Sequence, residues 1–150
     1  MDEFDRKILR VLQADASVTM AELAEQVGLS QTPCWRRVKA MEESGVIERR
    51  AVLLSADMLG YSVHVLAHIR LRQHDEDTLD RFEDAVRAHP EIVECFVMGG
   101  EYDYIVRVLA QSIGHYERFL RKVLLHLPGV AHVDSGFALK KVKLTTDIPV

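Results

Sequence analysis

The spacing between apolar residues first changes close to Gly60 in this chain of 150 residues. In the first 45 residues apolar side chains recur three and four positions apart, which places them on one face of a helix. Between residues 61 and 71 every second residue is apolar, which is typical of a strand with one buried face. The chain is therefore predicted to form a helical N-terminal domain followed by an α/β domain.

Three short helices are predicted in the N-terminal part, and the first spans residues 4–14. The predicted caps and ends of the other two are, in chain order, Ser17 or Thr19, Gly28, Ser30 and Gly45. Hydroxyl side chains are favoured at helix starts and glycine at helix ends. In the third helix the core-facing positions, i, i+4 and i+7, are Cys34, Val38 and Met41. Two short helices joined by a tight turn predict a helix-turn-helix.

The rest of the chain alternates strand and helix patterns in the order β-α-β-β-α-β. The predicted elements are strand 61–71, a helix from the acidic cap Asp75–Asp77 to just before Pro90, strands 92–98 and 102–109, a helix capped by Ser112, and a strand of residues 130–144. This order is the ferredoxin-like plan, with two helices on one face of an antiparallel sheet. The predicted fold is α+β, with domains 1–50 and 61–150 joined by a linker strand, 51–60.

The third helix carries a local cationic surface, although the formal net charge of the chain is −4. Arginine and lysine suit phosphate and base-edge contacts, polar residues in the first turn meet the DNA, and an aromatic ring packs on sugar or a thymine methyl. The candidate DNA-contacting residues are Gln31, Thr32, Trp35, Arg36, Arg37 and Lys39. Alanine at Arg36 or at Arg37 is expected to weaken specific binding. The alternative is a solvated face, with Trp35 covering a neighbouring helix.

A turn with two glycines and two acids separates the two middle strands. Gly99 and Gly100 permit unusual backbone angles and a close approach to a ligand. Glu101 or Asp103 can then accept hydrogen bonds from the ammonium group of an amino acid. No nucleophile or metal ligand accompanies these carboxylates, so acid–base catalysis is the less favoured interpretation. A simple hairpin turn with exposed acids is the other alternative.

The remaining residues with chemical potential give no further site. His64 and His68 lie about 13 Å apart on a strand at roughly 3.3 Å per residue, too far to share one metal ion. The only two cysteines, Cys34 and Cys95, are far apart in sequence, so neither a disulfide framework nor a zinc site is predicted. We expect no cofactor and no catalytic residue. With a charged N-terminus and no membrane-spanning stretch, a cytoplasmic location is expected.

Several segments together resemble one known family. The segments DRKILRVLQ, ELAEQVGLSQTPCWRRVKAMEESGVI, GEYDY and LPGV…FALKKVK are similar, in this order, to the Lrp/AsnC family of prokaryotic transcription regulators. The resemblance covers essentially the whole chain. It implies a DNA-binding helix-turn-helix joined to a ferredoxin-like domain that binds a small amino acid and oligomerises, with dimers that often assemble into rings of four dimers.

The resemblance also implies particular site residues. The DNA-reading segment would run from Ser30 to Lys39. The effector-binding residues would be Gly100, Glu101, Asp103 and Tyr104, with Ser135 on the last strand lining the same pocket, which in the family lies between dimers. The family more often has Asp where this chain has Glu101, so the pocket size and the choice of effector are expected to differ.

Two branches of the family are similar to different parts of the chain. TPCW and GEYDY resemble a cysteine-responsive branch, whereas RVKAMEE and FALKKVK resemble regulators of branched-chain amino-acid breakdown. Both remain open, as do the target genes and the sign of regulation. The alternative from another class is an enzyme or an amino-acid-binding module whose helical domain contacts other proteins. The main expectation is a double-stranded-DNA-binding regulator of amino-acid metabolism genes, without membrane association.

Overall fold

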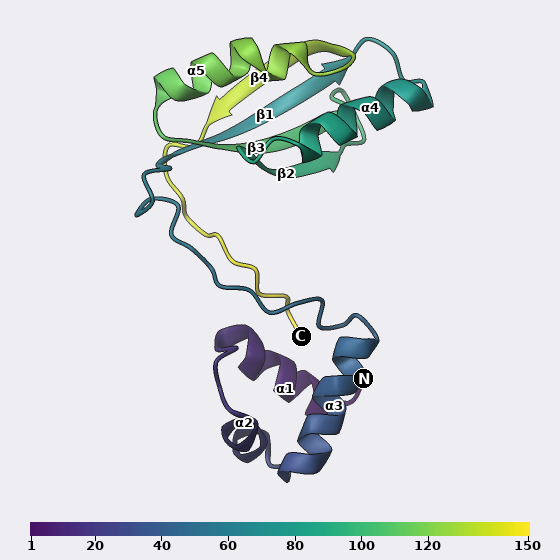
Figure 1. Ribbon diagram of the computed structural model, residues 1–150, viewed down its shortest axis with the longest axis vertical. Coiled ribbons are helices and arrows are strands. Elements are labelled where there is room, and N and C mark those ends of the chain that lie inside the picture. Colours follow the sequence, from purple (N-terminus) through teal and green to yellow (C-terminus); the bar gives the residue numbers. More distant parts are fainter. The chain divides into compact units, whose positions relative to one another are not determined.

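A computed structural model describes residues 1–150 as two compact units (Figure 1). The head unit comprises Met1–Leu53 together with Lys143–Val150, and the sheet unit comprises Leu54–Val142. Each unit has its own apolar core of buried side chains. None of the helices combines the length and the hydrophobicity that crossing a membrane requires.

The head unit contains the three predicted helices, α1 (Glu3–Ala14), α2 (Met20–Val27) and α3 (Gln31–Glu43). Asp2 caps α1 and Thr19 caps α2, and in each case the residue three positions later bonds back to the cap backbone. Gly28 ends α2 with φ 74°, a left-handed conformation that glycine adopts at little cost. The buried core joins all three helices through Ile8, Leu9, Leu23, Ala24, Val27, Cys34, Val38 and Met41. The prediction for this part of the fold is confirmed.

The sheet unit is built on four antiparallel strands, which lie side by side in the order β2-β3-β1-β4. Their bounds are β1 (Val63–Leu71), β2 (Ile92–Val97), β3 (Tyr104–Ala110) and β4 (Val130–Phe137), and the helices are α4 (Glu76–Arg87) and α5 (Ile113–Lys122). Both helices cover the same face of the sheet in Figure 1. This arrangement confirms the ferredoxin-like prediction. Asp75 and Ser112 cap the two helices, as their sequence positions indicate.

The two faces of the sheet differ in their environment. Alternate residues point under the helices and are fully buried, among them Val65, Ala67 and Ile69 of β1 and Val106 and Val108 of β3. The intervening residues point to the opposite face, which no helix covers (Figure 1). On that open face the side chains of Leu66 and Phe96 are 41% and 57% exposed. The sheet therefore has one face that completes a core and one face that no helix covers.

Two sequence predictions about strands are wrong. Residues 51–60 form no strand, and Val52, Leu53 and Leu54 are 73–85% exposed. An extended segment becomes a strand only when a second strand satisfies its backbone groups, and none pairs with this one. The final strand ends at Phe137 rather than near residue 144, because β1, its only pairing partner, begins at Val63.

The C-terminal segment also lies in a different unit from the one expected. The side-chain amide of Gln13 accepts a hydrogen bond from the Ile148 N–H at 2.7 Å and donates one to the Ile148 carbonyl at 3.1 Å. Arg10 Nε donates to the Val150 carbonyl at 2.8 Å, and Val150 packs against the head core. Residues Lys143–Val150 thus complete the head unit, although the sequence pattern places them with the α/β domain.

Candidate DNA interface and ligand loop

Helix α3 presents one buried face and one exposed face. Cys34, Val38 and Met41 are at most 6% exposed and hold the helix onto α1 and α2, as their spacing predicts. Trp35, Arg36 and Lys39 are exposed on the other side. Trp35 is 53% exposed, so about half of its surface is accessible. An exposed indole beside cations is a surface that can contact a polyanion.

The first turn of α3 keeps polar groups available. Ser30 occupies the N-cap position with extended backbone angles, but its hydroxyl makes no capping hydrogen bond. Gln31 and Thr32 follow it, and both are exposed. Because the first backbone N–H groups of a helix lack partners within the helix, this turn can donate hydrogen bonds to phosphate.

Arg37 has different surroundings from Arg36. Its Nη1 atom lies 2.7 Å from Asp5 Oδ1 and 2.8 Å from Asp2 Oδ2, and the guanidinium lies 5.6 Å from the Phe4 ring centroid. The pKa of Asp2 is lowered by the hydrogen bond from the Asp5 backbone N–H and by Arg37. Arg37 therefore joins α3 to the start of α1 through its Nη1 group.

The loop between β2 and β3 is tied to the end of β1. Gly100 has φ 126°, a conformation that favours glycine. The Asp103 backbone N–H donates to the Ile69 carbonyl at 2.9 Å. Asp103 Oδ2 accepts from the Leu71 backbone N–H at 2.7 Å, and Asp103 Oδ1 lies 2.8 Å from His74 Nε2. Both carboxylate oxygens of Asp103 thus hold this loop in place.

Glu101 is the exposed carboxylate of the loop, with 75% of its side chain accessible. Its Oε1 lies 2.8 Å from Arg70 Nη2, and Arg70 Nε donates to the Glu101 carbonyl at 3.2 Å. The Arg70 guanidinium also lies 5.3 Å from the centroid of the Tyr102 ring, whose hydroxyl donates to Asp134 at 3.3 Å. Glu101 is accessible to a ligand, in competition with Arg70.

The structure separates Tyr104 and Ser135 from the exposed part of the loop. Tyr104 is 2% exposed beneath α4, with its ring 4.5 Å from that of Phe82 and its hydroxyl donating to Glu83 at 2.9 Å. Burial and the Glu83 carboxylate raise the pKa of Tyr104. The Ser135 hydroxyl is hydrogen-bonded to the Tyr116 hydroxyl. Both residues therefore belong to the layer between sheet and helices, whereas Gly100, Glu101 and Asp103 lie together in the loop.

Sequence reasoning missed the residues of β1 and its continuation that support the loop, chiefly Arg70 and His74. Both hydrogen-bond to residues 29 to 31 positions away in sequence. The alternation of β1 indicates that Arg70 faces away from the helices. Predicting that Arg70 pairs with Glu101 would also require the register between β1 and β3, which the sequence does not give. The two histidines of β1 have separate partners, since His64 lies 3.8 Å from Asp57 and the His68 ring lies 5.1 Å from that of Tyr102.

Two family models together match nearly the whole chain. Residues 1–48 match a winged helix-turn-helix DNA-binding model, and residues 64–148 match the Lrp/AsnC ligand-binding domain. Among curated proteins, the DNA-binding transcriptional activator DecR of Escherichia coli K12 is 34% identical over all 150 residues, which cover 99% of DecR. The first matched segment includes the α3 surface, and the second includes the loop between β2 and β3.

Solved structures of similar proteins have the same fold. An AsnC family transcriptional regulator from Agrobacterium tumefaciens superposes with a TM-score of 0.95 at 43% identity, covering 99% of this chain and 97% of that one. A transcriptional regulator from Neisseria meningitidis, solved as a complex with L-Met, also gives a TM-score of 0.95, at 35% identity and with 99% and 96% covered. This chain belongs to the Lrp/AsnC family of DNA-binding transcriptional regulators.

Proposed function

We propose that the outward face of α3 reads DNA through Arg36, Lys39 and Trp35, with Ser30, Gln31 and Thr32 contacting phosphate or base edges at its first turn. The observation that carries this proposal is the division of α3 into a buried apolar face and an exposed face with two cations and an indole. Arginine and lysine on such a face can contact guanine edges and phosphates in the major groove. We place this activity in the cytoplasm, where bacterial DNA lies.

Arg37 has a supporting role in this proposal. Its Nη1 group is already paired with Asp2 and Asp5, which hold this side chain against the start of α1. We propose that Arg37 fixes the angle of α3 against α1 and leaves base contacts to Arg36. Each subunit of a dimer would then offer one such helix to one half of an imperfectly palindromic site.

We further propose that a small amino acid binds at the loop that carries Gly100, Glu101 and Asp103. The protein would then control genes of amino-acid metabolism in response to this ligand. Glu101 is exposed and can accept from an ammonium group, while Asp103 keeps the loop in place. Tyr104 and Ser135 support the strands beneath it. The complex of the Neisseria relative with L-Met supports an amino acid as the ligand class. Such a ligand changes DNA affinity only if it binds one assembly state more tightly than another.

The open face of the sheet suits a second copy of the chain. Leu66 and Phe96 are exposed there, and the charged pair on this face is internally satisfied, because Arg107 donates to both Glu94 oxygens at 2.9 Å. That hydrogen bonding lowers the pKa of Glu94. We propose a homodimer through this face, with higher assemblies such as an octamer built from dimers. Exposed apolar side chains on a sheet face that no helix covers are consistent with a protein–protein contact.

A charge on the open face is expected to break the dimer. Phe96→Glu would bury a carboxylate without a partner at the proposed interface, which costs several kcal/mol. Sedimentation of the variant should therefore give half the mass of the unaltered dimer. Ile113→Glu is the matched control, since Ile113 is an exposed apolar residue of α5 on the helix side of the sheet. An unchanged mass for Phe96→Glu would exclude this face as the interface.

The proposed function is tested by titrating the protein against DNA upstream of its own gene and of neighbouring genes, with each common amino acid added in turn. We expect a sequence-preferring complex that weakens steeply as salt rises, because bound cations release the counterions of the phosphates. One amino acid should alter the affinity. Absence of any complex at low salt would favour the alternative in which the head unit contacts other proteins.

A further inference from the structure

The chain is anchored to the head core directly after α3. Gly45 has φ 77°, and the Ile47 backbone N–H donates to the Met41 carbonyl at 3.0 Å. The side chain of Ile47 packs against the buried core of the head unit. These contacts fix the point at which residues 48–50 leave the C-terminal end of α3.

Two adjacent arginines, Arg49 and Arg50, follow this anchor, and both are exposed. Arg50 Nη2 lies 3.5 Å from Glu42 Oε1, whereas Arg49 forms no ion pair. No strand forms between α3 and β1, so the two side chains are not enclosed in a sheet or a hairpin. Both guanidinium groups are therefore accessible to a ligand outside the head unit.

The pairing with Glu42 places Arg50 at the C-terminal end of the proposed DNA-reading face. Glu42 follows Lys39 by three positions and Trp35 by seven, so the three side chains lie on one side of α3. Seven residues of helix span about 10 Å. With the N-terminal half of α3 in the major groove, which is about 12 Å wide, this end of the helix lies near the phosphates that border the groove.

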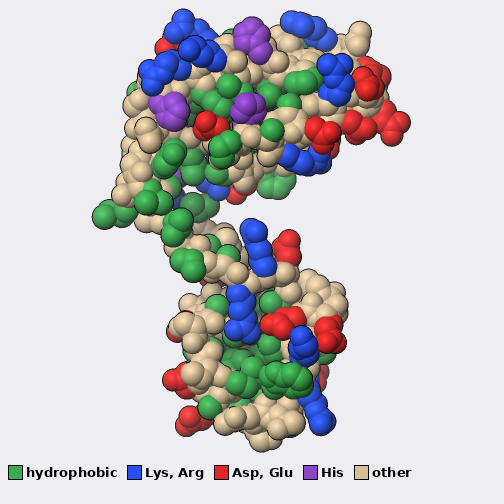
Figure 2. Space-filling view, viewed as in Figure 1, with side chains coloured by type: hydrophobic (Ala, Val, Ile, Leu, Met, Phe, Trp, Pro, Cys, Tyr) green, Lys and Arg blue, Asp and Glu red, His purple; other side chains and the backbone are tan.

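The last turn of α3 and the segment after it are acidic apart from the two arginines. Three acids, Glu42, Glu43 and Glu48, are exposed there, and Arg49 and Arg50 follow directly. Figure 2 shows acidic and basic side chains interspersed on the head unit. Carboxylates close to phosphates oppose DNA binding. This end of α3 can therefore approach the DNA backbone only if the two arginines offset these acids.

The ion pair of Arg50 differs from those of Arg37, which join α3 to α1. Arg37 Nη1 lies within 2.8 Å of two carboxylates, and its side chain is 32% exposed. The pair between Arg50 and Glu42 is longer, at 3.5 Å, and the Arg50 side chain is 49% exposed. Exposed pairs of this kind contribute little to stability. Arg50 can therefore turn to a phosphate without loosening the head unit.

We infer that Arg49 and Arg50 bind the phosphate backbone of double-stranded DNA beside the groove that α3 reads, and that Arg50 also offsets the charge of Glu42. This inference rests on the proposed function and deepens it, because it requires the exposed face of α3 to contact DNA. It extends the interface beyond the helix. Phosphate contacts add affinity without sequence preference, so base recognition remains with the side chains of α3.

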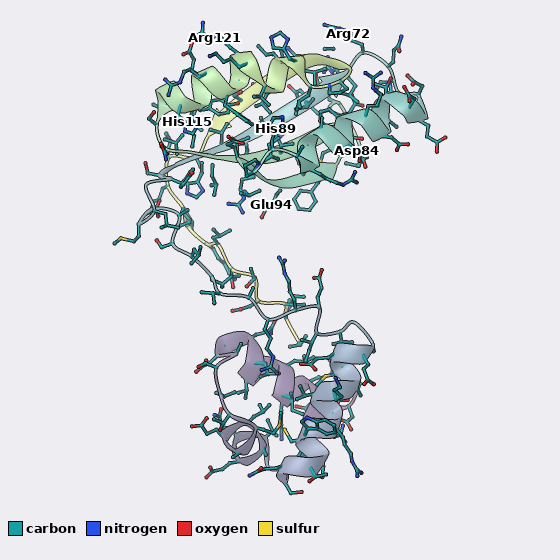
Figure 3. All side chains as sticks on the ribbon, in the orientation of Figure 1. Arg72, Asp84, His89, Glu94, His115 and Arg121 are labelled. Carbon is teal, nitrogen blue, oxygen red and sulfur yellow. The ribbon has the colours of Figure 1, made fainter.

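Titration of the full chain into fluorescently labelled DNA at several salt concentrations tests the inference. Arg49→Gln and Arg50→Gln should each weaken binding to the specific site and to unrelated DNA by the same factor, and lower the slope of log affinity against log salt by about one. Arg121→Gln is the matched control, because Arg121 also pairs with an exposed carboxylate, at 3.1 Å from Glu117. Figure 3 shows Arg121 on the side of α5 that faces away from the sheet. This variant loses the same charge and should keep the slope.

Glu42→Gln separates the two roles of Arg50. On its own this change should tighten DNA binding, because it removes a negative charge beside the phosphates. Combined with Arg50→Gln, it should restore part of the lost affinity but not the slope, because the phosphate contact of Arg50 is still missing. Recovery of both the affinity and the slope would mean that Arg50 only offsets Glu42, and its inferred contact would be wrong.

The outcomes separate this inference from the proposed function. If Arg36→Ala weakens binding while Arg49→Gln and Arg50→Gln match the Arg121→Gln control, the backbone contact is overturned and the proposed function stands. If the two variants lose affinity for the specific site alone, the arginines read bases and the inference is wrong. If the unaltered protein binds no DNA, the inference and the proposed function both fall.

Further measurements exclude indirect causes of lost binding. Thermal unfolding of each variant without DNA shows whether the head unit is still folded. Arg49→Lys keeps the positive charge and should keep the slope. Sedimentation shows whether assembly has changed, and an altered mass would place these arginines at a contact with a second copy of the chain, which overturns the inference.

Discussion

Arg36→Ala is expected to weaken sequence-specific DNA binding by about 1 to 3 kcal/mol, which is roughly a 5- to 150-fold loss of affinity. Arg36 is an exposed cation of the α3 surface, and no carboxylate within the head unit engages it. A bidentate contact from its guanidinium to one guanine edge would account for a loss of this size. Gel-shift titrations on the specific site and on unrelated DNA would measure it.

Two neighbouring cations provide the contrast for that experiment. Lys39→Ala should weaken binding to all sequences about equally and lower the slope of affinity against salt by about one. Arg37→Ala should instead lower the thermal stability of the head unit, because Asp2 and Asp5 lose their partner. If Arg36→Ala leaves both specific and nonspecific affinity unchanged, α3 does not read the DNA through this residue. If Arg37→Ala alone abolishes specificity without destabilising the head, the division of roles is reversed.

Phe82→Ala is expected to reduce the free energy of unfolding of the sheet unit by about 3 to 5 kcal/mol. Phe82 is completely buried in the centre of α4, and its ring packs 4.5 Å from that of Tyr104. Removing the ring leaves a cavity between helix and sheet that rigid strands cannot close. Because a domain is stable by only about 5 to 15 kcal/mol, this loss is a large share of the total.

Urea unfolding followed by circular dichroism would measure this loss, with Leu139→Ala as the control. Leu139 is 99% exposed, so its truncation should change the free energy of unfolding by no more than about 0.5 kcal/mol. A loss below about 1 kcal/mol for Phe82→Ala would mean that the layer between α4 and the sheet repacks around the missing ring. The hydrogen bond from Tyr104 to Glu83 would then be expected to shift as well.

The elements that form their own hydrogen bonds or follow a local period were predictable from the sequence. The spacing of Cys34, Val38 and Met41 placed α3 correctly, and Asp75 and Ser112 marked two helix starts. In contrast, the strand expected within residues 51–60 depended on a partner that local sequence does not specify. Local signals therefore predicted helices better than the extents of isolated extended segments.

The candidate sites were predictable to the level of the segment but not of each side chain. Arg36 and Arg37 are adjacent and chemically identical, and only the fold shows that Asp2 and Asp5 of α1 engage one of them. Tyr104 lies next to Asp103, yet strand alternation turns its ring under α4 with Val106 and Val108. The alternation of apolar residues along β3 was therefore enough to predict that Tyr104 is buried. The pairing of Arg70 with Glu101 depends on strand register and long-range packing, which a single sequence does not reveal.

The assembly of the head unit from two distant segments has a consequence for folding during synthesis. Ile148 and Val150 contact α1 through Gln13 and Arg10, so the last part of the head is translated after the whole sheet unit. Until those residues have been translated, the three helices lack the hydrogen bonds that Gln13 and Arg10 make to them. The head unit would then reach its full stability only once these residues have left the ribosome.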